Sequence, residues 1–149
     1  MTMAKLELEY IVRRSPESIR RWWLEFPDTY VAKDPREQPH RIVTRSRSDR
    51  EIHVTTFWRA PFGEAKTDEV LRLRSDGSWT ADTRFLGFHV HDEFRATVEG
   101  AGTRLRIEST LTPANSATRV LRPLLLPMMR RNFTKVWDDA AALCERDAP

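Results

Sequence analysis

The feature that most constrains the fold is a long helical pattern near the C-terminus, from Ala117 to Glu145. Apolar residues recur there at steps of three and four, which places them along one side of a helix. They are Leu121, Leu125, Met129, Phe133, Val136, Ala140 and Leu143. An apolar stripe of this length needs a cover, so we expect the helix to lie across a sheet that curves around it.

The chain before this helix opens with a strand and a shorter helix. Residues 5–12 alternate between apolar and charged side chains, which predicts a half-buried strand. Ser15-Pro16-Glu17 combines a capping residue, a proline suited to the first helical turn and an early acid, so a helix is predicted over residues 16–25. The following segment, up to Pro39, is expected to be a loop or a short second helix.

Six further strands are predicted, over residues 41–48, 51–59, 66–74, 79–86, 88–98 and 103–112. Asp76-Gly77 is a strong hairpin signal, Gly100-Ala101-Gly102 is a second turn, and Pro61-Phe62-Gly63 interrupts the alternation. Connections this short favour antiparallel neighbours, because parallel strands require a crossover of a dozen or more residues. The prediction is an α+β domain over residues 1–149, with a curved seven-stranded antiparallel sheet.

Composition narrows the class of protein. Hydrophobic residues make up 40% of the 149 and charged residues 32%, which fits one soluble domain. The net charge is +3, without a lysine-rich tail or an aromatic-interleaved basic motif, so no nucleic-acid partner is expected. A single cysteine, Cys144, excludes an intramolecular disulfide and predicts a buried thiol in a reducing compartment. No signal-peptide pattern opens the chain, so we expect a cytoplasmic protein.

The order of elements resembles the START-like, or SRPBCC, superfamily, which includes polyketide cyclases and lipid-transfer proteins. The resemblance rests on the opening strand, the Ser15-Pro16-Glu17 helix start with Trp22 and Trp23, the hairpins ending in Gly102-Thr103-Arg104-Leu105, and the terminal helix. It implies a helix-grip fold, in which the sheet wraps the C-terminal helix and leaves a cavity that commonly binds hydrophobic small molecules. Fold alone does not assign an activity, because carriers, cyclases and protein-binding regulators share this scaffold.

Polar residues in the inward phase of the strands are the candidates for chemistry. Asp92 interrupts the apolar series of residues 88–98, Glu69 precedes Leu71, and Ser109 lies between Ile107 and Leu111. A carboxylate walled by apolar groups has a raised pKa and suits proton transfer near neutral pH. The favoured alternative is that each acid faces water at a bulge or pairs with an arginine such as Arg72 or Arg95.

Three potential metal ligands, His89, His91 and Glu93, alternate on the opposite face of the same strand. Two histidines and a carboxylate suit a non-haem iron site. However, successive side chains on one strand face lie about 7 Å apart, too far to gather around one ion, so a solvated polar face is favoured. No nucleophile motif or phosphate-binding glycine loop is visible. We therefore predict neither a metal nor another cofactor.

The start of the terminal helix is apolar on too many sides for one stripe. Residues 119–131 combine leucines and methionines with four arginines, and Pro127 is expected to kink the helix. This pattern predicts a flexible cavity gate that contacts a membrane surface transiently or a dimer partner, with plain packing against the sheet as the favoured alternative. The chain is expected to be a monomer or a homodimer.

The leading hypothesis is binding of a lipid or a polyketide-like aromatic between the sheet and the terminal helix. The predicted binding residues are Tyr10, Thr56, Trp58, Glu69, Leu71, Phe88, Val90, Asp92, Phe94, Ser109, Leu125, Met128 and Met129. The first alternative is a cyclase or dehydratase in which Asp92 or Glu69 moves a proton and Tyr10 or Ser109 stabilises an enolate. The second is a co-chaperone-like module that presents arginine-rich strand faces to an acidic partner. Trp22, Trp23, Trp79 and Trp137 are expected in the core.

Overall fold

The structure is a computed structural model and describes residues 4–25, 27–34, 36, 38–61, 63–85 and 87–149. One antiparallel sheet has the spatial order β1-β8-β7-β6-β5-β4-β3-β2. Its strands are β1 (Ala4–Val12), β2 (Thr29–Val31), β3 (Arg41–Arg47), β4 (Glu51–Ala60), β5 (Gly63–Leu73), β6 (Trp79–Phe85), β7 (Phe88–Glu99) and β8 (Gly102–Pro113). Two helices, α1 (Pro16–Leu24) and α2 (Ser116–Asp147), complete the fold.

The sheet contains eight strands, so the predicted count of seven is wrong. The additional strand is β2, which pairs with β3 at the edge of the sheet, in a segment expected to be a loop or a short helix. Only Thr29–Val31 pair, a run too short to show an alternation in the sequence. The predicted antiparallel pairing is confirmed for every neighbouring pair. Phe62 and Leu86, which fell within predicted segments, lie outside the described residues.

The two helices begin at capping residues that the sequence supplies. Ser15 accepts a hydrogen bond from the Ser18 backbone N–H at 3.1 Å, and Pro16 occupies the first turn of α1. Asn115 caps α2 in the same way, accepting from the Thr118 backbone N–H at 2.8 Å. Side-chain oxygens at these positions satisfy N–H groups that have no partner within the helix.

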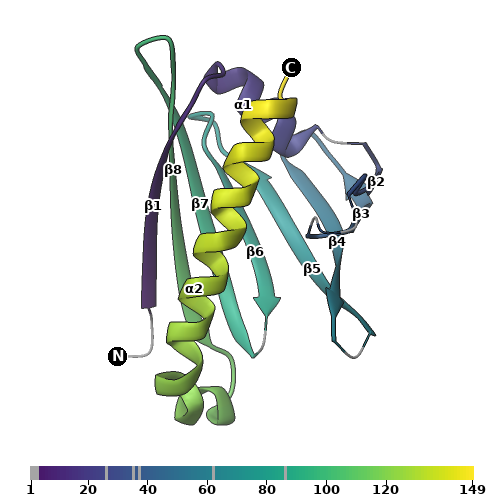
Figure 1. The fold of residues 1–149 in the computed structure, drawn as a ribbon, viewed down its shortest axis with the longest axis vertical. Helices are drawn as coiled ribbons and strands as arrows, with labels where there is room; N and C mark the ends of the chain where they lie inside the picture. The colour runs from purple at the N-terminus through teal and green to yellow at the C-terminus, as the bar shows by residue number, and fades with distance from the viewer. Residues whose placement is uncertain (1–3, 26, 35, 37, 62, 86) are drawn as a thin grey trace.

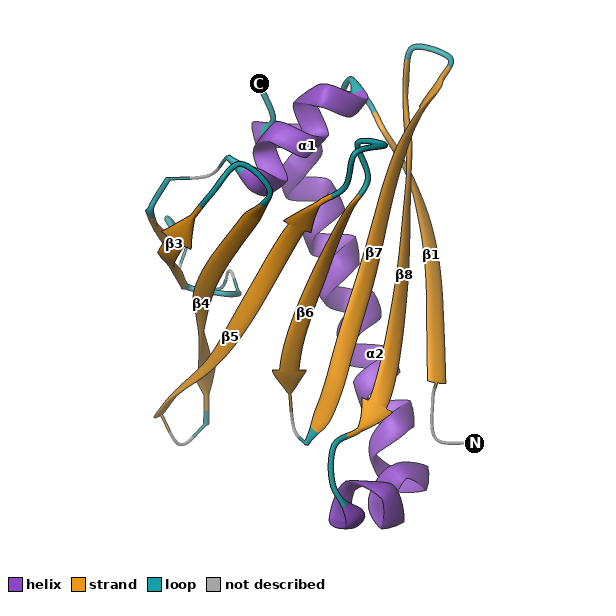
Figure 2. Cartoon of the chain, turned by 180° about the vertical axis from the view of Figure 1, so that it is seen from behind, coloured by secondary structure: helices purple, strands orange, loops and turns teal. Residues whose placement is uncertain are grey.

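Helix α2 lies over only part of the sheet. Figures 1 and 2 show it crossing the side formed by β1, β8 and β7, whereas β3, β4 and β5 extend beyond it. Its first turns, which include Pro123 and Pro127, run at an angle to the rest and reach past the strand ends. This bend fits the loss of backbone hydrogen bonds at proline. Leu121 is 46% exposed there, so its expected burial in the apolar stripe is wrong.

Aromatic side chains fill the space between α2 and the middle of the sheet. The rings of Trp79 and Phe94 stack with centroids 5.4 Å apart, and Trp137 from α2 meets the Phe94 ring edge-on at 5.5 Å. Trp23 from α1 lies 5.1 Å from the same Phe94 ring. The four tryptophans predicted in the core are confirmed there, with Trp79 fully buried and Trp22, Trp23 and Trp137 packed against the core cluster. Large aromatics therefore occupy the space directly between α2 and the sheet.

Candidate functional site on the inner face of the sheet

Asp92 lies buried on the inner face of β7, opposite Ser109 on β8. It is 3% exposed, and its carboxylate accepts a hydrogen bond from the Ser109 hydroxyl. The indole N–H of Trp137 donates to the same hydroxyl oxygen at 3.3 Å. Burial raises the pKa of Asp92 to about 7, against the opposing effects of Ser109 and His91. The expectation that Asp92 faces water or pairs with an arginine is therefore wrong.

Glu69 lies on the inner face of β5, between Val54 on β4 and Thr83 on β6. Its side chain is half-buried, and within the described chain no hydrogen bond or ion pair joins it to another residue. Burial raises the pKa of Glu69 to about 8, with further contributions from the charges of Asp92 and Asp82. Glu69 is thus a carboxyl group that is partly screened from water and has no partner among the described residues.

The arginines expected to neutralise these acids have other partners. Arg72 contacts Glu51 at 3.2 Å and Asp82 at 3.1 Å, and Arg95 lies 3.5 Å from Asp76. Ion pairs also cover the arginines of β8, where Arg104 contacts Glu9 and Glu99 and Arg106 contacts Glu7 and Glu108. An arginine-rich face that is paired locally offers little to an acidic partner, which argues against the co-chaperone-like alternative.

Tyr10 points inward from β1 as predicted, but its hydroxyl donates to Asp138 of α2 at 2.5 Å. Burial, followed by the hydrogen bond and the charge of Asp138, raises the pKa of Tyr10. The phenol therefore joins β1 to the terminal helix. Nothing in this geometry directs it toward Glu69 or Asp92.

Two hydroxyl groups lie beyond Glu69 on the same face of β4 and β5. Thr56 on β4 and Thr67 on β5 face each other and share a hydrogen bond, and the indole N–H of Trp58 donates to the Thr67 hydroxyl at 3.0 Å. Thr56 is buried, whereas Trp58 and Thr67 are half-buried. Thr67 was not among the predicted site residues, although it shares the inward phase of Glu69 and Leu71, the signal that reveals it.

Several predicted binding residues belong to the packed core. Leu71, Phe88, Val90 and Phe94 are each at most 4% exposed. Met129 is fully buried against Phe88 and Val90, Leu125 is half-buried beside it, and Met128 is 45% exposed. The two methionines of the predicted gate therefore point to different environments, because neighbouring residues of a helix lie about 100° apart around its axis.

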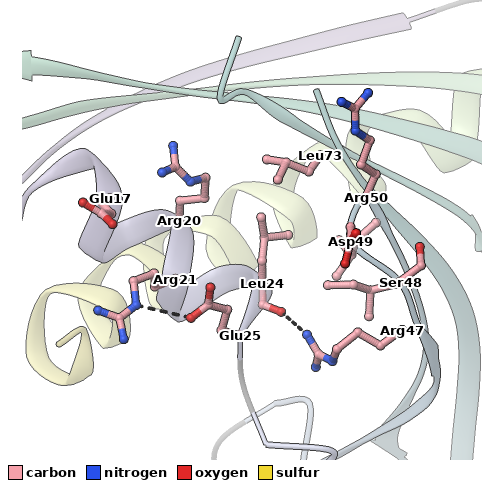
Figure 3. Close-up of a pocket in the computed structure, with 12 residues that line it drawn as sticks. Glu17, Arg20, Arg21, Leu24, Glu25, Arg47, Ser48, Asp49, Arg50 and Leu73 are labelled. Atoms are coloured by element: carbon pink, nitrogen blue, oxygen red, sulfur yellow. Dashed lines mark hydrogen bonds and ion pairs between the residues drawn. The ribbon is translucent and has the colours of Figure 1, made fainter. Parts of the chain in front are cut away.

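The larger described hollow, about 530 Å³, lies between α1 and the turn joining β3 to β4 (Figure 3). Its apolar residues are Leu24, Ile52, Leu71 and Leu73, and its charged and polar residues are Glu17, Arg20, Arg21, Glu25, Arg47, Ser48, Asp49 and Arg50. Arg21 pairs with Glu25 at 3.2 Å, and Arg47 donates to the Leu24 carbonyl at 2.6 Å. The cavity was expected between the sheet and α2. The hollow lies beside α1 instead, because the aromatic cluster fills the space between α2 and the sheet.

The apolar floor of the hollow and the polar side chains of Glu69, Thr56 and Thr67 lie next to one another on the inner face of β4 and β5, and together they form the inner strip. The β4–β5 register pairs Ile52 with Leu71, then Val54 with Glu69, and then Thr56 with Thr67. Alternate residues of paired strands share one face of a sheet, so the apolar side chains are followed along this face by a carboxyl group and then by two hydroxyl groups. Periodicity had placed these residues on one face; which part of that face stays open depends on where the helices pack.

The histidines of β7 occupy the outer face. His91 Nδ1 lies 2.7 Å from Asp82 Oδ1, and His89 Nε2 lies 3.3 Å from the same oxygen. Among the residues that the structure describes, no cluster of three or more His, Cys, Asp or Glu side chains has metal-binding geometry. His89 and His91 therefore form part of a polar surface network around Asp82.

Solved structures share this architecture at low sequence identity. The Zhui aromatase/cyclase from Streptomyces sp. R1128 matches with a TM-score of 0.69 and 14% identity, over 97% of this chain and 94% of that chain. One half of the di-domain aromatase/cyclase BexL matches with a TM-score of 0.69 and 12% identity, over 99% of this chain and 50% of that chain. Norcoclaurine synthase from Thalictrum flavum, in complex with dopamine and hydroxybenzaldehyde, matches with a TM-score of 0.59 and 10% identity, over 99% and 89% of the two chains.

The chain thus has the START-like helix-grip fold, as the order of its elements suggested. No protein-family model matches the sequence, and no curated protein matches it. Among the described residues, no helix combines the length and the apolar character that crossing a bilayer requires. At these identities the likeness establishes the fold, and any function depends on the inner face itself.

Proposed function

We propose that the protein binds a hydrophobic small molecule along the inner strip of β4 and β5. The apolar part of the ligand lies over Ile52, Leu71 and Leu73 in the hollow beside α1, and a polar group of the ligand contacts Glu69. The observation that carries this proposal is Glu69 itself, a half-buried carboxyl group that follows the apolar floor along β5 and has no partner among the residues that the structure describes. A partly desolvated polar group of this kind gains from a ligand hydrogen bond.

Neighbours of the same fold support this class of ligand. One is described as an aromatase/cyclase and another is a complex with two small aromatic molecules. The strip suits an aromatic or alicyclic ligand that carries a hydroxyl or carbonyl group, because the apolar side chains of Ile52 and Leu71 are followed on the same face by the Glu69 carboxyl group and by the Thr56 and Thr67 hydroxyls. The predicted residues Thr56, Trp58, Glu69 and Leu71 remain in the proposed site, whereas Phe88, Val90, Phe94 and Met129 serve as packing around it.

Binding is tested with the fluorescent aromatic probe 1-anilinonaphthalene-8-sulfonate and with native mass spectrometry of the protein as purified. Leu73→Glu places a charge on the half-buried apolar floor, and we expect at least a tenfold loss of probe affinity. The matched control is Val98→Glu, which adds the same charge on the inward phase of β7, at a position that is 75% exposed. Equal affinity of the two variants, both folded by circular dichroism, would rule out the hollow as the site.

We further propose proton transfer by Glu69 as a second function, in an enzyme of the cyclase or dehydratase type. With a pKa raised to about 8, Glu69 is present in both protonation states near neutral pH, which suits a general acid or base. As a carboxylate, it accepts the proton from a carbon next to a ketone. The electron pair of the broken C–H bond then forms the enolate. Asp92 is sealed from this surface by its burial, so its role is to repel charge on Glu69.

The second function is tested by deuterium exchange into the carbon between the two carbonyl groups of 1-phenylbutane-1,3-dione, followed by NMR in heavy water. Wild-type protein should accelerate exchange, with a rate that rises as pH passes the pKa of Glu69. Glu69→Gln should abolish the acceleration, while Glu7→Gln on the outer face of β1 should retain it. Acceleration that persists in Glu69→Gln would exclude Glu69 as the base while leaving the binding proposal intact.

A further inference from the structure

The start of α2 exposes a cluster of large aliphatic side chains. Among the described residues, seven large hydrophobic side chains are exposed, and four of them lie within nine positions of this helix. Val120 is 77% exposed, Leu124 76%, Leu121 46% and Met128 45%. The other three, Ile11, Val31 and Val98, are isolated on separate strands, which is normal for a soluble protein.

Only one of the two apolar sides of this helical segment packs against the sheet. Met129 is buried and Leu125 and Leu126 are half-buried, and these residues pack against the cluster of Phe88, Val90 and Leu111. Val120, Leu124 and Met128 follow one another at steps of four, so they form a separate stripe on the outer side. The sequence is therefore apolar on two sides of the helix, and the fold covers one.

The charges around the exposed stripe have a single sign. No aspartate or glutamate occurs from Ser109 to Trp137, whereas Arg119, Arg122, Arg130, Arg131 and Lys135 lie in this stretch. The side chains of Arg119, Arg130 and Arg131 form no ion pair within the described chain. This contrasts with the outer face of β8, where Arg104 and Arg106 form ion pairs with nearby glutamates.

The segment is also accessible to a flat surface. Figures 1 and 2 show the first turns of α2 at one end of the molecule, past the ends of the strands. An aliphatic stripe flanked by Arg119, Arg130 and Arg131, which form no ion pair with any described residue, matches a bilayer interface, where lipid phosphates lie directly above acyl chains.

We propose that the start of α2 docks on anionic lipid bilayers. Val120, Leu124 and Met128 enter the interface, and Arg119, Arg130 and Arg131 contact the lipid phosphates. The helix does not span the bilayer; it lies on its surface and detaches readily, because the inserted apolar area is small. The inference is independent of the ligand proposed for the inner strip.

The test is flotation of the full chain with vesicles of phosphatidylcholine alone or of equal parts phosphatidylcholine and phosphatidylglycerol. We expect binding to the mixed vesicles and a loss of about tenfold or more in the double variant V120S/L124S, since each buried methylene contributes about 0.8 kcal/mol. R130Q/R131Q should lose about 30-fold on the mixed vesicles, at about 1 kcal/mol per arginine. The matched control I11S/V98S, which removes two exposed aliphatic side chains elsewhere, should bind as wild type does.

Three outcomes would overturn the proposal. The first is equal binding of V120S/L124S and I11S/V98S to the mixed vesicles. The second is the absence of any preference of the wild type for phosphatidylglycerol. The third is a wild-type dimer in analytical ultracentrifugation that V120S/L124S converts to a monomer, because a second copy of the chain would then cover the stripe. Circular dichroism of each variant establishes that the helix is still formed.

Discussion

Replacing Glu69 by glutamine should stabilise the protein at alkaline pH and have little effect at acidic pH. The pKa of Glu69 is raised from 4.5 to about 8, chiefly by burial. Below about pH 4.5 the group is protonated in both the folded and the unfolded chain, so its pKa has no influence on stability there. Between the two values the unfolded chain ionises while the folded chain holds its proton, so the free energy of unfolding falls as pH rises. Above about pH 8 both states are ionised and the loss is complete.

The size of the effect follows from the two pKa values. At about 1.4 kcal/mol per pH unit, the interval from 4.5 to about 8 corresponds to an upper limit of roughly 5 kcal/mol. Because the side chain is half-buried, partial hydration of the carboxylate lowers the expected value to roughly 2–4 kcal/mol. Glutamine keeps the shape of the side chain and cannot ionise, so the variant escapes this loss.

Urea unfolding followed by tryptophan fluorescence measures the effect at about pH 5 and about pH 8.5. The difference in unfolding free energy between E69Q and wild type should be small at the lower pH and roughly 2–4 kcal/mol at the higher pH. E7Q, on the outer face of β1, controls for the change of carboxyl to amide. A difference between E69Q and wild type that is equal at the two pH values would refute the raised pKa and, with it, the proposed proton transfer.

Three further predictions concern single groups. Burial raises the pKa of Cys144 to about 12, so Ellman's reagent should label this thiol only as fast as the protein unfolds; rapid labelling of the folded protein would contradict its burial. Asn115→Ala should lower the free energy of unfolding by about 1 kcal/mol and Asn115→Asp should restore it, because either side-chain oxygen caps α2 at Thr118; no loss in the alanine variant would exclude the cap. Ser109→Ala removes a hydrogen bond that lowers the pKa of Asp92, so the NMR titration midpoint of that carboxyl should move above about 7; a lower midpoint would reverse this assignment.

The sequence predicted most of the secondary structure because its periodicities are strong. The alternation in β1, β7 and β8 and the turns at Asp76-Gly77 and Gly100 are local signals, and the structure confirms them. Strand β2 was missed because its three residues pair only through contact with β3, which the local sequence does not specify. A short edge strand of this kind depends on its neighbour more than on its own composition.

Inward and outward faces were also predictable, but access to solvent was not. Asp92 and Glu69 both lie in the inward phase of their strands, and no local pattern distinguishes which of them is accessible to solvent. In the structure Asp92 is buried beside Ser109 and Trp137, whereas Glu69 stays half-buried and has no partner within the described part of the chain. The difference arises because α2 covers the β1, β8 and β7 side of the sheet and leaves β4 and β5 beyond it.

By itself, the sequence determined the order of the elements other than β2, the cap of α1 and the faces of the long strands, since each depends on residues close together in the chain. Only the tertiary structure decided where the hollow lies, which acid stays accessible and which side of the α2 start remains uncovered. These features depend on where a helix comes to rest on a sheet, and that position is set by aromatic contacts between Trp23, Phe94 and Trp137, residues distant in sequence. Periodicity specifies a face, but packing between elements specifies what that face meets.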